Sequence, residues 1–194
     1  FLTLSDTQLA GLLFHELAHQ KLYIKGDTTF NESFATAVEI EGVRRWTTLH
    51  HNHPELYARY LQEKKIRQTF VAMVQKTRTA LAAIYQNTEL SDPEKIIQKQ
   101  QQILQLRAHY QTLKTTEWDN KGYFDQWFQG PLNNAQLSTI GTYHDWVDAF
   151  LVLLAENNHD MNAFYKASAQ LGKEPKVKRT QRLQALMQKS TQKQ

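Results

Sequence analysis

A long run of apolar side chains at helical spacing occupies residues 54 to 86. Pro54 suits the first turn of a helix, because the backbone N–H that proline lacks has no partner there anyway. The apolar positions that follow are Leu56, Tyr60, Ile66, Phe70, Val74, Leu81 and Ile84. A second run starts at Pro93, with an apolar stripe of Ile96, Ile97, Ile103, Leu104 and Leu106. Two long helices joined by a short turn predict an antiparallel helical hairpin over residues 54–115.

The segment before this hairpin carries two capping-box patterns. Ser5 opens the first pattern, which precedes a helix predicted over residues 6–21. Thr29 opens the second, which precedes a helix predicted over residues 30–49. Two further helices are predicted over residues 143–156 and 161–171. No alternating apolar run of strand length occurs beyond residues 22–24, so the predicted fold class is all-α.

We predict one helical domain over residues 1–194. Its parts are a metal-binding helix pair (1–50), the long hairpin (54–115), an aromatic connection with closing helices (116–172) and a frayed basic tail (173–194). The chain opens at Phe1 without an initiator methionine, so we expect a fragment of a longer protein. Any β-sheet would then lie in the missing N-terminal region.

Composition narrows the functional classes. The chain has no cysteine, so a metal would have to be held by His, Asp or Glu. The net charge of +4 comes largely from lysines and arginines after residue 172, which is a local feature and does not favour nucleic-acid binding. The only long apolar stretch, residues 146–155, is too short to cross a bilayer, and no membrane contact of this chain is expected.

The sequence His15-Glu16-Leu17-Ala18-His19 carries the chemistry. Two histidines four residues apart lie on one face of a helix, where both imidazoles can reach a single ion. Glu16 cannot reach the same coordination position, but it can flank the site and act as general base toward a water molecule. The alternative is a chance pair of histidines beside a solvated glutamate, since short motifs also occur by accident.

Glu32 offers a third ligand at the start of the second predicted helix. A catalytic zinc ion takes three protein ligands and keeps one open position, and two His with one Glu is an established set. We therefore expect one Zn²⁺ per chain, held by His15, His19 and Glu32. The competing interpretation makes Glu32 a first-turn carboxylate that serves the helix dipole and the capping box.

These residues resemble the gluzincin metallopeptidases, in which a second helix bears the third ligand in an Asn-Glu-x-x-Ala setting. Residues 31–35 match that setting. The run from Asn31 to Glu39 is similar to the aminopeptidase version, and the resemblance implies that Glu39 supports a zinc-bound histidine. Together with Asn133-Asn134-Ala135 and Tyr143, the motifs resemble a bacterial family described as putative aminopeptidases. That resemblance implies a bacterial cell-envelope or periplasmic location.

Other candidate site residues have two interpretations each. Tyr143 and His144 are candidate donors to the oxygen that becomes negative during peptide hydrolysis, although Tyr143 could equally pack its ring in the core. Asn133 and Asn134 are candidate substrate-binding residues, or they cap a helix. The histidines at 50, 51 and 53 could form a second metal site, but solvation of a helix end explains them better. The aromatic residues between 118 and 128 could line a subsite or anchor the connection to the core.

The sequence thus predicts zinc-dependent peptide hydrolysis, aminopeptidase-like, with a peptide or protein as substrate. A non-catalytic scaffold with a structural zinc ion is the alternative. Glu16 argues against that alternative, because a structural site needs no base.

Overall fold

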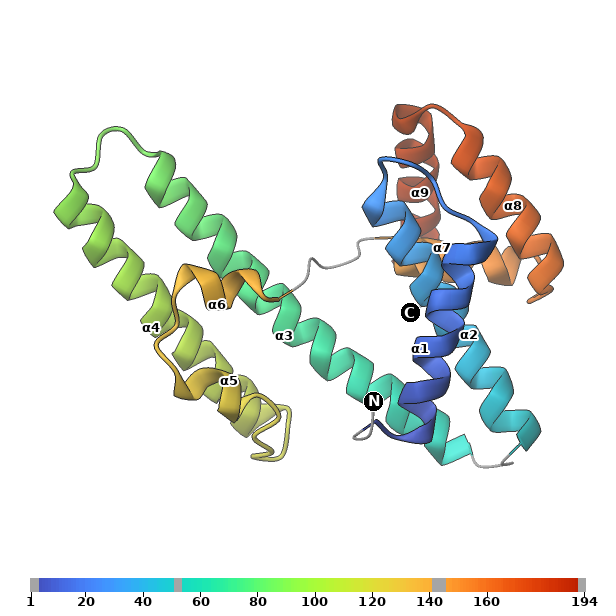
Figure 1. Cartoon of the computed structure of the whole chain (residues 1–194), viewed down its shortest axis with the longest axis horizontal. Coiled ribbons are helices and arrows are strands. Elements are labelled where there is room, and N and C mark those ends of the chain that lie inside the picture. Colours follow the sequence, from blue (N-terminus) through green and yellow to red (C-terminus); the bar gives the residue numbers. More distant parts are fainter. Residues whose placement is uncertain (1–3, 51–53, 141–145, 192–194) are drawn as a thin grey trace. The chain divides into compact units, whose positions relative to one another are not determined.

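The computed structural model describes residues 4–50, 54–140 and 146–191 (Figure 1). These ranges contain nine α-helices and no strand, which confirms the predicted all-α class. The helices are α1 (Asp6–Lys21), α2 (Thr28–His50), α3 (Pro54–Gln86), α4 (Asp92–Thr116), α5 (Asp125–Gln129), α6 (Asn134–Ser138), α7 (Val147–Glu156), α8 (Met161–Lys173) and α9 (Lys176–Thr191). None of the helices in these ranges has the length and apolarity needed to span a membrane.

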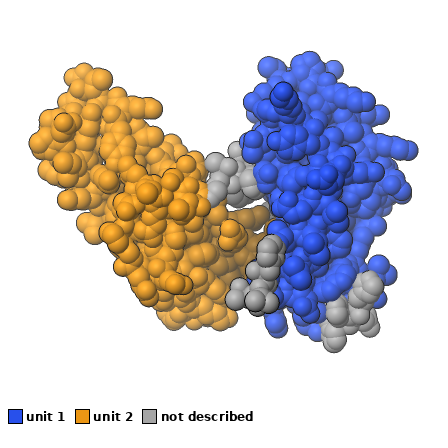
Figure 2. Space-filling view, in the orientation of Figure 1, with its two compact units in different colours: residues 1–61, 144–194 blue, residues 62–143 orange. Residues whose placement is uncertain are grey.

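The chain divides into two compact units, shown in different colours in Figure 2. Unit 1 contains Phe1–Leu61 and His144–Gln194, and unit 2 contains Gln62–Tyr143. The helices α1, α2, α7, α8 and α9 therefore belong to unit 1, whereas α4, α5 and α6 belong to unit 2. Helix α3 begins in unit 1 and continues into unit 2. The single-domain prediction and its internal boundaries stay predictions.

An aromatic cluster forms the core of unit 1. Phe30 and Phe34 on α2 pack against Phe150 on α7 and Phe164 on α8, and all four side chains are fully buried. The rings of Phe30 and Phe150 meet edge to face with centroids 5.0 Å apart, and Phe34 stacks on Phe164 at 5.7 Å. Burying each such side chain contributes about 1.5–3 kcal/mol, so the cluster holds α2 firmly against its neighbours.

Helix α2 begins one residue earlier than its predicted cap. The carboxylate of Asp27 accepts a hydrogen bond from the backbone N–H of Phe30 at 3.1 Å and so serves as the N-cap of a helix that starts at Thr28. The capping box predicted from Thr29 to Glu32 is therefore wrong. Because Phe30 occupies the third helical position, Glu32 lies beyond it and is not the reciprocal partner of that cap.

The connection between α1 and α2 is held by one buried amide. Asn31 is 1% exposed; its Oδ1 accepts from the backbone N–H of Ile24 at 2.7 Å, and its Nδ2 donates to the carbonyl of Ile24 at 2.8 Å. Gly26 has φ of 79°, a left-handed conformation that glycine adopts at little cost. The turn therefore sets how the start of α2 faces the end of α1.

The basic C-terminal segment is a packed helix, and the prediction of a frayed tail is wrong. Leu183 and Leu186 on α9 are buried in the core of unit 1. Arg179 is buried as well, and its guanidinium donates to Asp27 at 2.6 Å and to the carbonyl of Gly172 at 2.9 Å. The lysines conceal an amphipathic pattern, because leucines three residues apart share one face of the helix.

Unit 2 contains α4 and the part of α3 that follows Leu61, and these two helices lie side by side and pack through their side chains as the predicted hairpin (Figure 1). The segment after α4 folds back onto them. Phe124 stacks on Phe70 with centroids 3.9 Å apart, and Phe128 stacks on Tyr110 at 4.2 Å. Trp118 is 4% exposed in the same cluster. The aromatic connection therefore anchors itself to the core of unit 2, the second of the two interpretations given above.

Candidate metal centre

His15 and His19 lie on one face of α1, as their spacing predicts. Their ring centroids are 5.0 Å apart and the ring planes meet at 79°. The side chains are 17% and 18% exposed, so both rings are largely buried yet reachable from solvent. Helix α1 owes its start to the predicted capping box, in which the Ser5 hydroxyl accepts from the backbone N–H of Gln8 and the Gln8 side chain accepts from Ser5.

Glu32 reaches across from α2 to both histidines. Its Oε2 lies 3.2 Å from His15 Nε2, and its Oε1 lies 3.5 Å from His19 Nε2. The candidate ligand atoms of the three residues all lie within 4.8 Å of one another. The structure thus brings together the three residues that the sequence predicts as metal ligands.

The donor set fits a zinc ion. Two ligand atoms of a tetrahedral zinc, each about 2.0–2.1 Å from the metal, lie about 3.4 Å apart. The separations from Glu32, 3.2 Å from Oε2 to His15 and 3.5 Å from Oε1 to His19, involve different carboxylate oxygens, and each is close to that value. Two imidazole nitrogens with one carboxylate oxygen form a site with three protein ligands, which is the number that catalytic zinc sites use.

Glu39 lies two turns further along α2 than Glu32, on the same face. Its Oε2 is 3.2 Å from His15 Nδ1, on the opposite side of the ring from Glu32. An ionised carboxylate only accepts hydrogen bonds, so the bond to Glu39 places a proton on Nδ1, and Nε2 is the ring atom that can take a further proton or a metal ion beside Glu32. His19 differs, because its Nδ1 is buried without a hydrogen-bond partner in the described part of the chain.

The electrostatic environment of His15 reflects these two carboxylates. Burial lowers the pKa of His15, but the hydrogen bonds and negative charges of Glu39 and Glu32 outweigh it, so the pKa lies above its ordinary value of 6.5. A cation at Nε2 is therefore favoured, whether it is a proton or a metal ion. The two compete for the same lone pair.

Glu16 is exposed on α1, about 100° around the helix axis from His15. This position keeps its carboxylate out of the three-ligand group, as the motif predicts. Tyr143 and His144, the candidate donors to the reacting oxygen, lie outside the described residues. His51 and His53 do so as well.

Asn133 and Asn134 lie in unit 2, whereas the three-ligand group lies in unit 1. Asn133 caps α6, since its Oδ1 accepts from the backbone N–H of Gln136 at 2.9 Å. The side chain of Asn134 lies 3.3 Å from the hydroxyl of Tyr85, to which its Nδ2 donates. The capping alternative thus accounts for Asn133, and a substrate-binding role for either residue stays a prediction.

The site residues that the sequence predicts do not include Tyr60 and Gly11, which lie beside Glu39 in the structure. The pattern of residues 54–86 indicates only an apolar position for Tyr60, yet its hydroxyl donates to Glu39 Oε1 at 2.6 Å. No local signal links two residues that are 21 positions apart. Gly11 did carry a signal, because glycine inside a helix costs about 1 kcal/mol relative to alanine and usually has a packing reason.

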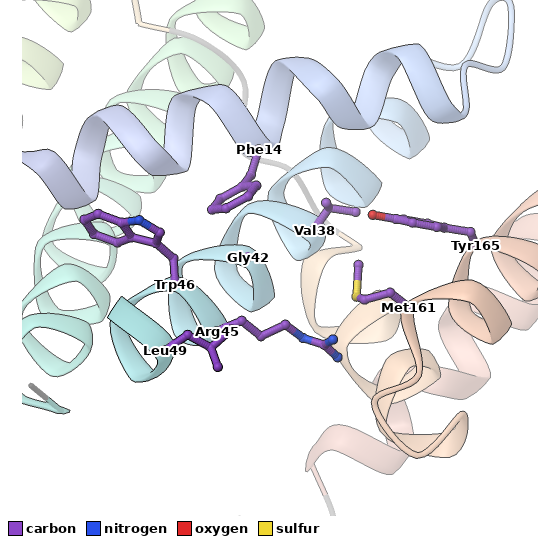
Figure 3. A pocket seen from close by; sticks show the side chains of 8 residues that line it. All are labelled: Phe14, Val38, Gly42, Arg45, Trp46, Leu49, Met161 and Tyr165. Atoms are coloured by element: carbon purple, nitrogen blue, oxygen red, sulfur yellow. The ribbon is translucent and has the colours of Figure 1, made fainter. Parts of the chain in front are cut away.

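Unit 1 also contains a pocket of about 260 Å³ between α1, α2 and α8 (Figure 3). Phe14 lines it from α1, Val38 and Trp46 from α2, and Met161 and Tyr165 from α8. None of the three candidate ligands is among its described lining residues. The pocket is therefore lined by other residues than the three candidate ligands.

Comparison with known proteins places the chain in a family. A family model described as "Putative aminopeptidase" matches residues 1–183, which includes all of the candidate site residues. No curated protein and no solved structure matches the chain. Because the family model covers far more than half of the sequence, the chain belongs to the family described as "Putative aminopeptidase".

Proposed function

We propose that this protein is a zinc-dependent aminopeptidase of the gluzincin type. His15, His19 and Glu32 hold the metal, and Glu16 acts as general base. The observation that carries the proposal is the convergence of two helices on one point, with Glu32 oxygens 3.2 Å and 3.5 Å from the two Nε2 atoms. The family description supports the aminopeptidase part of the proposal.

The residues of the chain divide the work of peptide hydrolysis. A zinc ion bound here supplies Lewis-acid chemistry, which polarises a peptide carbonyl and makes water easier to deprotonate. Glu16 accepts the proton of the attacking water and then donates it to the leaving amine. The candidate donors Tyr143 and His144 would stabilise the oxygen that becomes negative.

The degree of exposure favours catalysis over a structural role for the metal. The three side chains are 17%, 18% and 29% exposed, so solvent and a substrate can approach the group. A structural zinc site is usually closed by a fourth protein ligand, whereas the group found among the described residues has three members. A peptide is therefore the proposed substrate. A bacterial cell-envelope location rests on the family resemblance alone.

Metal analysis combined with peptidase assays tests this proposal. We expect purified protein to hold about one zinc ion per chain. His15→Ala and Glu32→Ala should lose it. His109→Ala, which removes an exposed histidine of α4, is the matched control and should keep it.

Glu16→Gln separates the general base from the ligands. This variant should retain zinc and lose about 10²–10⁴-fold in kcat on aminoacyl substrates. Glu117→Gln, an exposed glutamate beyond the end of α4, should leave both unchanged. Zinc retained at full affinity in Glu32→Ala would remove Glu32 from the ligand set, and full activity in Glu16→Gln would remove the proposed base.

A further inference from the structure

We propose that Tyr60 is a positioning residue of the metal centre: it fixes the carboxylate of Glu39, which in turn orients His15. This inference rests on the proposed function, because it assigns Tyr60 a part in holding the zinc-binding ring. Three helices then contribute to the orientation of one ligand, with His15 on α1, Glu39 on α2 and Tyr60 on α3.

The hydrogen bonds form a continuous chain. The hydroxyl of Tyr60 donates to Glu39 Oε1 at 2.6 Å, and Glu39 Oε2 accepts from His15 Nδ1 at 3.2 Å. A carboxylate held at one oxygen can rotate about its last bonds. Held at both oxygens, it keeps its plane and presents one fixed acceptor to the imidazole. The bond from Tyr60 therefore restricts the direction in which His15 can point.

Tyr60 is itself held in place by burial. It is 3% exposed, and its ring packs in a cluster with Ile40, Val43 and Val147. Burial and the negative charge of Glu39 raise the pKa of the Tyr60 hydroxyl far above its ordinary value of 10, so the hydroxyl stays protonated and remains a donor. A ring that cannot move sets the position of the oxygen at its end.

Gly11 permits this arrangement from the side of α1, one helical turn before His15. A Cβ atom at Gly11 would lie 3.2 Å from Glu39 Oε1 and 3.3 Å from Tyr60 Cε2. At such short distances the neighbouring atoms would have to move by a few tenths of an ångström. The glycine therefore leaves the space that the bond between Tyr60 and Glu39 occupies.

The pair Tyr60→Phe and Tyr57→Phe isolates the hydroxyl in question. Both tyrosines lie on α3 in unit 1, and their rings stack with centroids 6.4 Å apart. Phenylalanine keeps the ring and removes only the oxygen. Zinc affinity of the full chain is measured by competition with a chromophoric chelator. Loss of an outer hydrogen-bond partner commonly weakens metal binding about 10–100-fold, and we expect about tenfold for Tyr60→Phe and no change for Tyr57→Phe.

Two further measurements separate positioning from a merely structural role. In a Glu39→Gln background, Tyr60→Phe should cause little additional loss of zinc affinity, because Tyr60 acts through Glu39. The visible absorption spectrum of the cobalt-substituted protein should change in Tyr60→Phe and stay unchanged in Tyr57→Phe. If Tyr60→Phe does not fold, Gly11→Ala tests the same contact from α1 and should also weaken zinc binding.

The outcomes distinguish this inference from the proposed function. If wild type binds zinc and cleaves peptides while Tyr60→Phe matches Tyr57→Phe in affinity and cobalt spectrum, the inference fails and the proposed function stands. A full, independent loss for Tyr60→Phe in the Glu39→Gln background would also overturn it. If wild type binds no zinc, the proposed function fails and the inference fails with it.

Discussion

Glu32 Oε2 lies 3.2 Å from His15 Nε2, although the two residues are 17 positions apart and belong to different helices. A ligand that binds both residues therefore also ties α1 to α2. Binding to the folded state alone stabilises a protein by about 2.7 kcal/mol when the ligand is at a hundredfold excess over its Kd. The metal should accordingly act on stability as well as on catalysis.

Zinc should raise the Tm of the wild-type protein. A gain of about 2.7 kcal/mol corresponds to about 5–10 °C for a chain of this size. Differential scanning calorimetry with and without zinc measures the shift, and a chelator should reverse it. Glu32→Ala should show no shift, whereas His109→Ala should show the full one. An equal shift in wild type and Glu32→Ala would mean that zinc binds elsewhere.

Arg179→Met should destabilise unit 1 strongly. The Arg179 and Asp27 side chains are only 7% and 12% exposed, and removing one partner of a buried ion pair costs about 3–5 kcal/mol. Asp27 also caps α2, so its carboxylate would be left buried with fewer donors. Chemical denaturation measures the free energy of unfolding.

Arg182→Met is the matched control on the same helix. Arg182 pairs with Glu174 at 2.7 Å, but its side chain is 63% exposed. Exposed pairs contribute about 0–1 kcal/mol, so this substitution should have a small effect. Similar losses in the two variants would contradict the buried role of Arg179.

Lowering the pH should reduce the free energy of unfolding, partly through Glu41. Burial raises the pKa of Glu41, but the hydrogen bonds and charges of Arg44 and Arg45 outweigh it, and the pKa lies below its ordinary value of 4.5. A carboxyl whose pKa is lower in the folded state contributes stability above the unfolded pKa and loses it as the pH falls through the folded pKa. His159 Nδ1 also faces this carboxylate at 3.8 Å.

The difference in unfolding free energy between wild type and Glu41→Gln should therefore be largest above pH 4.5 and shrink below it. Urea denaturation between pH 3 and 7 measures the difference. Glu117→Gln, which removes an exposed carboxylate, should give a difference that varies little with pH. A constant difference for Glu41→Gln over the same range would show that its charge does not stabilise the fold.

Gly42→Ala should disturb the packing of α1 on α2. A Cβ at Gly42 would lie 2.6 Å from the ring of Phe14, which precedes His15 on α1. Forcing extra volume into a packed contact costs about 1–3 kcal/mol. We expect a lower Tm and weaker zinc binding. Gly130→Ala meets its nearest atom at 3.6 Å and is the control that should change neither.

Local sequence determined most of the helices and, in the candidate metal centre, the shared face of His15 and His19. The spacing of His15 and His19 places both on one face of α1, because a helix repeats every 3.6 residues whatever surrounds it. The cap at Ser5 and the hairpin of α3 and α4 follow from similarly short patterns. Features that depend on a few consecutive residues are readable without knowledge of the rest of the chain.

Tertiary structure decided how the helices meet. The N-cap of α2 is Asp27 and not the predicted Thr29, and Asp27 also pairs with Arg179, 152 residues away. The same long-range contact and two buried leucines hold α9 against the core of unit 1, where the sequence predicts a frayed tail.

By itself, the sequence determined that His15 and His19 share a face of one helix and that Glu32 lies at the start of the next helix. The family resemblance already implies Glu39 as a residue that supports a histidine ligand, but only the tertiary structure placed the hydroxyl of Tyr60 against the carboxylate that faces His15. The physical reason is range: helical periodicity is set by bonds between neighbouring residues, whereas contacts between helices depend on packing along their whole lengths.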